Sequence, residues 1–263
     1  MSFTVSLTNQ KGGVGKTQSA ANLAYALSTK NQRVLAIDAD PQSSLTLYLG
    51  LNPVELEASQ SCLHHALIHG KPLAEVIQHL EDFDLVPASI RMAREARSLI
   101  GAVDSLTRLK KVLTGIASEY DFIILDTPPS FTDLFLNTLV AADGVIVPIK
   151  TDQMSAFGFS DIVETVAEIR RELNPRLQII GVIPTMYQKN YSVDERVLND
   201  LYDLSVGRFE VFPPVRRSTR YDKAFDEEQP ALKLYPDTPG IESYAVVADY
   251  LINHAAEVSG VVR

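Results

Sequence analysis

The chain has a single cysteine, a negative net charge and no long apolar segment. One cysteine among 263 residues excludes an internal disulfide framework and is typical of a reducing cytoplasm. No run approaches the roughly 18–20 apolar residues that a membrane span needs. No apolar leader precedes the first strand-like segment, which starts at Phe3. We therefore expect a soluble, cytoplasmic protein that is not exported.

Acidic residues outnumber basic ones, and the net charge is −9. The chain as a whole does not look like a nucleic-acid binder. Locally the balance differs, because basic residues gather after a Pro-Pro pair, at Arg216, Arg217, Arg220 and Lys223. A smaller group comprises Arg170, Arg171 and Arg176. Acidic residues at 226–228 follow the first cluster directly, so a solvated face is a rival interpretation to an anion-binding surface.

The sequence has no Gly/Ser linker and no internal repeat, and apolar strand-like runs alternate with helical spacing. This alternation predicts one α/β domain over residues 1–263, with a doubly wound, mostly parallel sheet flanked by helices. We expect strands at 3–7, 34–37, 83–86, 122–125, 145–149, 177–183 and 209–212. Helices are expected at 17–28, 106–117, 157–173, 193–204 and 241–256, with two short ones between 52 and 87.

A glycine-rich loop follows the first strand, at Lys11-Gly12-Gly13-Val14-Gly15-Lys16-Thr17. An ordinary phosphate loop reads G-x-x-x-x-G-K-[ST], with backbone N–H groups and one lysine on the phosphates and a hydroxyl on Mg²⁺. The opening glycine of that pattern would fall at Gln10 and is absent. The loop therefore contains two lysines, Lys11 and Lys16, whereas an ordinary phosphate loop uses a single lysine for its nucleotide. The helix expected after the loop points its N-terminus at the anion.

Carboxylates end two further strands. Asp38 and Asp40 follow the strand at 34–37, and Asp126 follows the strand at 122–125. Because the carboxyl ends of parallel strands form the ligand-binding edge of a sheet, these charges are expected beside the phosphate loop. Asp126 is the natural group to hold Mg²⁺ through its water shell.

KGGVGKT, DADPQSSLT and FIILDTPPS together resemble the deviant Walker A ATPases, and within them the ParA-type partition ATPases. The resemblance extends from about residue 2 to 256, although residues 52–118 match in layout only. It implies an ATP hydrolase with ATP and Mg²⁺ as cofactors, working as an ATP-sandwich homodimer. Lys11 would reach the partner's ATP, Asp40 would orient the attacking water, and Asp38 would stand near the metal. The implied nucleotide contacts are Lys11, Gly12, Gly13, Val14, Gly15, Lys16, Thr17 and Gln18, with Thr17 and Asp126 at the metal.

The resemblance also implies partners. A ParA-type dimer binds nonspecific nucleoid DNA through basic residues in this C-terminal stretch, and a ParB-like adaptor stimulates its slow hydrolysis. Arg220 matches best by spacing, followed by Arg217, with Arg216 and Lys223 beside them. The cargo would be a plasmid or chromosome. The alternative is the same switch positioning a protein cargo such as carboxysomes or chemoreceptor clusters. Relatives hold the adenine ring near the strand ends at Met186 and Pro213.

Other branches of the superfamily fit less well. Iron–sulfur relatives need paired cysteines, and the chain has one. MinD-like relatives dock on membranes through a basic amphipathic C-terminal helix, whereas the tail after Tyr250 carries a single basic residue. The chain begins at the first strand, so we expect no N-terminal helix-turn-helix domain. A metabolic P-loop enzyme would need a second substrate pocket, for which the sequence gives no signal.

Cys62, His65 and His69 lie at i, i+3 and i+7, a spacing that would place all three on one face of a helix. Imidazole and thiolate suit zinc. A fourth ligand is not evident in the sequence, and Leu63, Ala66 and Leu67 supply an apolar stripe beside the three residues. The sequence therefore favours a core-facing helix over a metal site.

Overall fold

The computed structural model describes residues 2–96 and 104–260. Its centre is a sheet in which eight strands were found among the described residues, in the order β3-β4-β2-β5-β1-β6-β7-β8. Every neighbouring pair is parallel except β3 with β4. The strands are β1 Phe3–Leu7, β2 Val34–Asp38, β3 Gln78–His79, β4 Asp84–Val86, β5 Phe122–Asp126, β6 Gly144–Lys150, β7 Gln178–Thr185 and β8 Glu210–Val211. This confirms the predicted doubly wound, mostly parallel sheet.

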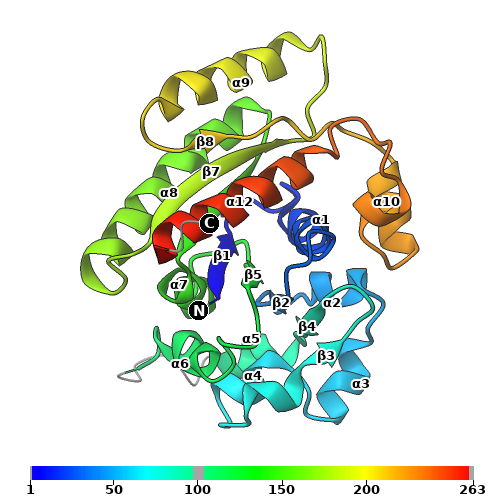
Figure 1. The fold of residues 1–263 in the computed structure, drawn as a ribbon, viewed down its shortest axis with the longest axis vertical. Helices are drawn as coiled ribbons and strands as arrows, with labels where there is room; N and C mark the ends of the chain where they lie inside the picture. The colour runs from blue at the N-terminus through cyan, green and yellow to red at the C-terminus, as the bar shows by residue number, and fades with distance from the viewer. Residues whose placement is uncertain (1, 97–103, 261–263) are drawn as a thin grey trace.

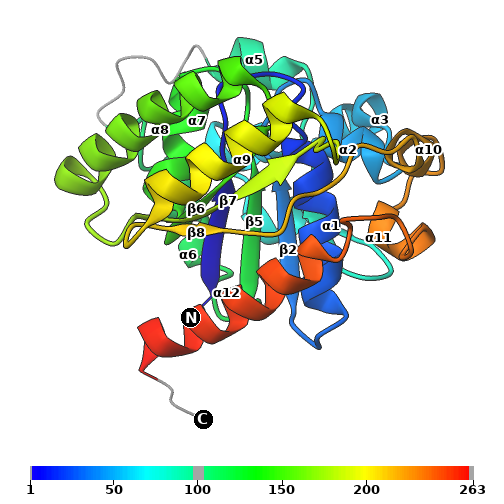
Figure 2. The same ribbon diagram turned by 90° about the horizontal axis from the view of Figure 1, so that it is seen from above.

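Helices cover both faces of the sheet (Figures 1 and 2). In Figure 2, α12 runs along one side of the strands and α8 lies on the other. The helical segments are α1 Lys16–Ser28, α2 Ser44–Tyr48, α3 Pro53–Ala58, α4 Leu63–Leu67, η1 Leu73–Val76, α5 Arg91–Glu95, α6 Arg108–Thr114, α7 Asp133–Ala141, α8 Gln153–Glu172, α9 Ser192–Ser205, α10 Arg220–Asp226, α11 Ala231–Leu234 and α12 Ser243–Ser259.

The core forms because the central strands are apolar on both sides, as expected for strands buried in a parallel sheet. Side chains on one face of β1, β2 and β5 pack against α1 and α12. Alternate residues of β2 and β5 face α4 and α6 on the other side. A third cluster joins β6 and β7 to α7, α8 and α9. Small alanines in α1 are fully buried, so this helix lies close against the sheet.

The topology places three strand ends together. β1 lies between β5 and β6, and β5 lies between β1 and β2. In the register of these pairs Leu7 is opposite Asp126, and Asp126 is opposite Asp38. The connection that leaves β1 leads to β2, on one side of β1 in the strand order. The connection that leaves β5 leads to β6, on the other side of β1. Ligands of open α/β sheets bind at such a switch point.

The predicted elements agree with the structure in order and type, and differ in their ends. The helix expected at 106–117 is shorter, at Arg108–Thr114, and the one expected from 157 begins at Gln153. The prediction lacks the nine-residue helix α7 and the shorter elements α2, α5, α10, α11 and β3. Helices of four to seven residues are too short to be stable alone, so neighbouring structure determines them. None of the helices among the described residues is long and apolar enough to cross a membrane.

Candidate active site

The loop between β1 and α1 has the backbone that its glycines predict. Gly13 has φ 70° and Gly15 has φ 85°, a left-handed region that favours glycine. Thr185, at the end of β7, donates from its hydroxyl to the carbonyl of Val14 at 2.8 Å and fixes the loop from the far side. Helix α1 starts at Lys16, so its first N–H groups open onto the loop. This arrangement forms an anion-binding cradle.

Lys16 is buried, and its ammonium lies 3.4 Å from the carbonyl oxygen of Lys11. Burial lowers the pKa of Lys16, while the nearby carboxylates of Asp126 and Asp40 oppose that shift. A cation held at a low-dielectric position between a phosphate cradle and two carboxylates is suited to phosphate binding.

Asp126 is fully buried at the end of β5. Among the residues that the structure describes, neither of its carboxylate oxygens accepts a hydrogen bond of normal geometry. Burial raises the pKa of Asp126 well above its ordinary value, and the Thr17 hydroxyl and Lys16 ammonium only partly oppose that shift. A buried carboxylate without a donor is costly unless a cation compensates it. The donor set of one carboxylate and one hydroxyl therefore fits Mg²⁺.

Both carboxylate oxygens of Asp38 accept hydrogen bonds from neighbouring residues. One carboxylate oxygen accepts from the backbone N–H of Asp40 at 3.1 Å. The other accepts from the backbone N–H and the hydroxyl of Thr46, at 2.8 and 2.7 Å. These bonds fix both ends of the loop that carries Asp40, so Asp38 acts as a positioning residue for that loop. Its expected place near the metal stays a prediction.

Asp40 lies across the cleft from the phosphate loop. Its carboxylate accepts from the backbone N–H of Gln42 at 2.9 Å, which orients the side chain. Burial raises the pKa of Asp40, and the Gln42 hydrogen bond and the Lys16 charge partly offset the shift. A positioned carboxylate with a raised pKa at a phosphate cleft is able to accept a proton from water or to orient it.

Lys11 does not face its own phosphate cradle. Its ammonium lies 3.0 Å from both carboxylate oxygens of Asp152, which follows β6. Its backbone N–H donates to the Asn9 side chain at 2.9 Å, so the backbone is anchored at the loop entrance. The side chains of Lys11 and Asp152 are 39% and 30% exposed. The second lysine of the loop is therefore held at the surface, beside the cleft.

Two adjoining cavities open at this edge of the sheet. The first, of about 390 Å³, is lined by the phosphate loop together with Asp40, Tyr48 and Phe225. The rings of Tyr48 and Phe225 stack with centroids 5.4 Å apart and form its outer wall. The second, of about 630 Å³, lies beyond Gly15 between the ends of β6 and β7 and the segment after β8. Gln18 and Met186 line both.

The two residues expected to lie near adenine, Met186 and Pro213, have different positions relative to the two cavities. Met186 borders the cavities with a left-handed backbone, at φ 56°. Pro213 lines neither cavity, and its carbonyl accepts a hydrogen bond from Ser243 at the start of α12. The segment after β8 contributes Val215 instead, because the chain reaches the cavity two residues later. The sequence analysis did not predict that Tyr48 and Phe225 line the smaller cavity. Both lie on short helices, which leave little signal in the sequence.

The four basic residues expected to bind DNA divide into two kinds. Arg216, Arg217 and Lys223 are exposed, and no carboxylate among the described residues forms an ion pair with them. Arg220 is different: its guanidinium is 2.8 Å from the Asp237 carboxylate and lies over the Tyr235 ring. Arg217 is anchored by its backbone N–H to the Tyr187 carbonyl, at the rim of the larger cavity.

Comparison with known proteins identifies the family. A family model described as an AAA domain matches residues 2–179. The chain is 32% identical over 251 residues to the sporulation initiation inhibitor protein Soj of Bacillus subtilis, with 94% of this chain and 97% of that protein covered. It is 33% identical over 253 residues to the chromosome-partitioning ATPase Soj of Thermus thermophilus, with 96% of each covered. The chain belongs to the ParA-type partition ATPases.

A solved structure extends this result to the fold. The cobyrinic acid a,c-diamide synthase of Mycobacterium smegmatis, with a bound ATP analogue and magnesium, superposes with a TM-score of 0.81 at 29% identity. The match covers 97% of this chain and 96% of that one. As a ParA/MinD-type P-loop protein the chain is an ATP hydrolase, with ATP and Mg²⁺ as its cofactors.

Proposed function

We propose that this ParA-type ATPase is a nucleotide-controlled dimer that binds DNA in its ATP state and positions a cargo. The observation that carries the proposal is the position of Lys11. The ammonium of this phosphate-loop lysine is paired with Asp152, and Lys11 does not line the cleft formed by its own loop. It is accessible to a second copy that approaches across the cleft.

The roles of the other site residues follow from their positions. Lys16 and the loop N–H groups, with Gln18 beside them, would bind the phosphates, and Thr17 and Asp126 would hold Mg²⁺. Asp40 would orient the attacking water while Asp38 fixes its loop. Lys11 would neutralise charge that develops on the partner's phosphates, where a preorganised cation has its largest effect on rate. Hydrolysis is slow until dimer and adaptor are both in place.

The DNA surface would comprise Arg216, Arg217 and Lys223, with Arg220 contributing less because Asp237 already compensates it. Each phosphate contact gives little affinity alone, and contacts add through counterion release. Dimerisation doubles every contact on one face. This is how a chain of net charge −9 would hold a polyanion in one nucleotide state and release it in the other.

The cargo would be a chromosome or plasmid, and the Thermus thermophilus relative is named a chromosome-partitioning ATPase. The partner would be a ParB-like adaptor, as the sequence resemblance implies. We place the protein in the cytoplasm, on the nucleoid, with residues 1–263 acting as one domain and no membrane contact.

The proposal is tested by retention on nonspecific duplex DNA, measured with a biosensor at two salt concentrations. Wild type is expected to bind with ATP and not with ADP, with log affinity falling by about 0.9 per log salt for each phosphate neutralised. The double substitution Arg216→Glu, Arg217→Glu is expected to abolish retention. The control is Arg94→Glu on α5, an exposed arginine outside the cluster. Nucleotide-independent binding, or full retention by the double variant, would contradict the proposal.

A further inference from the structure

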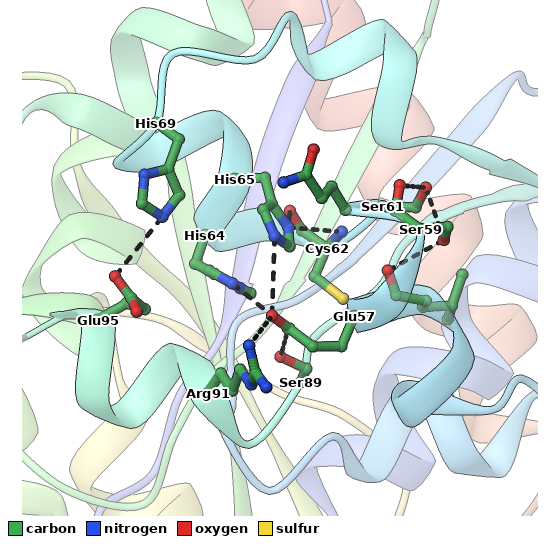
Figure 3. Close-up of polar contacts among 12 residues, drawn as sticks. Glu57, Ser59, Ser61, Cys62, His64, His65, His69, Ser89, Arg91 and Glu95 are labelled. Atoms are coloured by element: carbon green, nitrogen blue, oxygen red, sulfur yellow. Dashed lines mark hydrogen bonds and ion pairs between the residues drawn. The ribbon is translucent and has the colours of Figure 1, made fainter.

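A second group of chemically reactive side chains lies away from the nucleotide cleft, where α3, α4 and the loop after β4 meet. Glu57 comes from α3, Cys62 precedes the first turn of α4, and His64 and His65 are in α4 (Figure 3). The two imidazoles and the carboxylate line a cavity of about 1060 Å³. No role in nucleotide binding involves these residues.

The spacing of this group is that of metal ligands. One ligand atom from each of the four residues lies within 4.8 Å of all the others. The Glu57 carboxylate is 3.4 Å from Nε2 of His64 and 3.8 Å from Nε2 of His65. These distances are long for hydrogen bonds, which fall at about 2.7–3.2 Å. Ligands at about 2.1 Å from a tetrahedral zinc ion lie roughly 3.4 Å from one another.

We propose that Glu57, Cys62, His64 and His65 bind one Zn²⁺ ion in a tetrahedral site that joins α3 to α4. Mixed thiolate, imidazole and carboxylate ligands suit zinc and exclude Mg²⁺ and Ca²⁺, which require oxygen.

Burial supports an ion at this position. Cys62 and His64 are 0% and 1% exposed. Polar groups buried without partners destabilise a fold. A dication with one thiolate and one carboxylate forms a neutral centre, so this charge combination is compatible with a buried site.

Neighbouring groups orient the ligands. The Ser89 hydroxyl donates to Glu57, and the Arg91 guanidinium lies 3.6 Å from the same carboxylate (Figure 3). Nδ1 of His65 lies 3.3 Å from both the backbone nitrogen and the backbone carbonyl oxygen of Cys62. When that nitrogen carries the proton, Nε2 presents its lone pair to the metal. Support of ligands by carboxyl, carbonyl and hydroxyl groups is typical of protein metal sites.

Zinc binding has a defined proton balance. Zinc takes a deprotonated thiolate and a neutral imidazole as ligands. Binding therefore displaces the proton of the Cys62 thiol. Zn²⁺ forms the Zn–S bond as the S–H bond breaks, and the proton leaves to solvent through the cavity. No oxidant or reductant takes part.

The structure also corrects the trio that the sequence suggested. Helix α4 ends at Leu67, so Cys62, His65 and His69 do not share one helical face. His69 is half exposed and its Nε2 lies 3.5 Å from Glu95, outside the four-residue group. His64 and Glu57 take its place. Leu63, Ala66 and Leu67 are buried in the core, as expected.

The test is metal titration of the full chain with Zn²⁺, and with Co²⁺ as a spectroscopic probe. Wild type is expected to bind one ion per chain, to show the visible bands of tetrahedral Co²⁺ with a thiolate charge-transfer band, and to melt at a higher temperature with zinc. Cys62→Ser is expected to lose the charge-transfer band. Cys62→Ser and His64→Ala are each expected to weaken zinc binding at least about tenfold. Excess Mg²⁺ is expected not to compete with zinc or Co²⁺ for this site.

Two further variants keep the result decisive. Glu57→Gln preserves the shape of a partly accessible side chain, and it is expected to weaken zinc binding while leaving the circular dichroism unchanged. His69→Ala is the matched control and is expected to bind zinc as wild type does. Failure of wild type to bind micromolar zinc would overturn the proposal. So would unchanged affinity in Glu57→Gln and Cys62→Ser, or a loss in His69→Ala equal to that in His64→Ala.

Discussion

Replacement of Asp38 by asparagine is expected to change how the stability of the protein depends on pH. Asp38 is fully buried, and burial raises its pKa from 3.8 to about 7, although the hydrogen bonds from Thr46 and the Asp40 backbone partly oppose the shift. In the unfolded chain the carboxyl group ionises freely. Between about pH 4 and 7 the folded state therefore holds a proton that the unfolded state has lost.

The sign and size follow from proton linkage. Because the folded pKa lies above the unfolded one, this group destabilises the fold progressively as pH rises through that window. A shift of about 3 pKa units at 1.36 kcal/mol each makes the full loss about 4 kcal/mol. About 2–3 kcal/mol of it lies between pH 5 and 7.5. Asparagine does not titrate, so the variant lacks this loss of stability. Removal of the Asp38 charge also lowers the pKa of Asp126, and this further reduces the loss of stability with rising pH in the variant.

The assay is urea unfolding of the nucleotide-free protein at several pH values from 5 to 7.5, for wild type and Asp38→Asn. The asparagine NH₂ group would face the Asp40 N–H, and the lost hydrogen bond lowers the free energy of unfolding by the same amount at every pH. The observable is therefore the difference in slope and not the difference in stability at one pH. Wild type is expected to lose about 2–3 kcal/mol more than the variant over this range. Parallel curves would refute the assignment of a proton to this buried group.

The remaining predictions concern the chemistry of the cleft. Lys16→Ala removes the buried cation of the phosphate loop and is expected to abolish ATP binding in calorimetry; unchanged affinity would show that the loop is not the phosphate site. Asp40→Ala is expected to lower kcat by about 10²- to 10⁴-fold, the usual contribution of a general base, while ATP-dependent dimerisation persists. Loss of dimerisation together with hydrolysis would instead make Asp40 a structural residue.

The sequence predicts the parts of the site that depend on local geometry. Gly13 and Gly15 occupy left-handed backbone positions that favour glycine. Asp38 and Asp126 end buried strands, and the pairing of parallel strands brings them together without further information. Element order and type follow from apolar periodicity for the same reason. These features were predictable because each depends on a few consecutive residues.

Contacts between distant segments were not predictable. Lys11 forms an ion pair with Asp152, which lies 141 positions further along the chain. Nothing in the sequence near either residue indicates the pairing. Phe225 reaches the nucleotide cleft on α10, a helix of seven residues whose placement depends on its neighbours. Glu57 lies on a different helix from Cys62 and His64, so a spacing rule within one helix selects the wrong ligands. Short helices and long-range ion pairs are determined by packing of the complete fold.

The position of Lys11 provides the most direct test of the account. The measurement is the molar mass by light scattering during size exclusion, with a non-hydrolysable ATP analogue or with ADP, for wild type and Lys11→Ala. We expect wild type to be dimeric with the analogue and monomeric with ADP. Lys11→Ala should remain monomeric with both nucleotides while still binding the analogue. A variant that dimerises normally, or a wild type that stays monomeric with the analogue, would contradict the proposed ATP-dependent dimer.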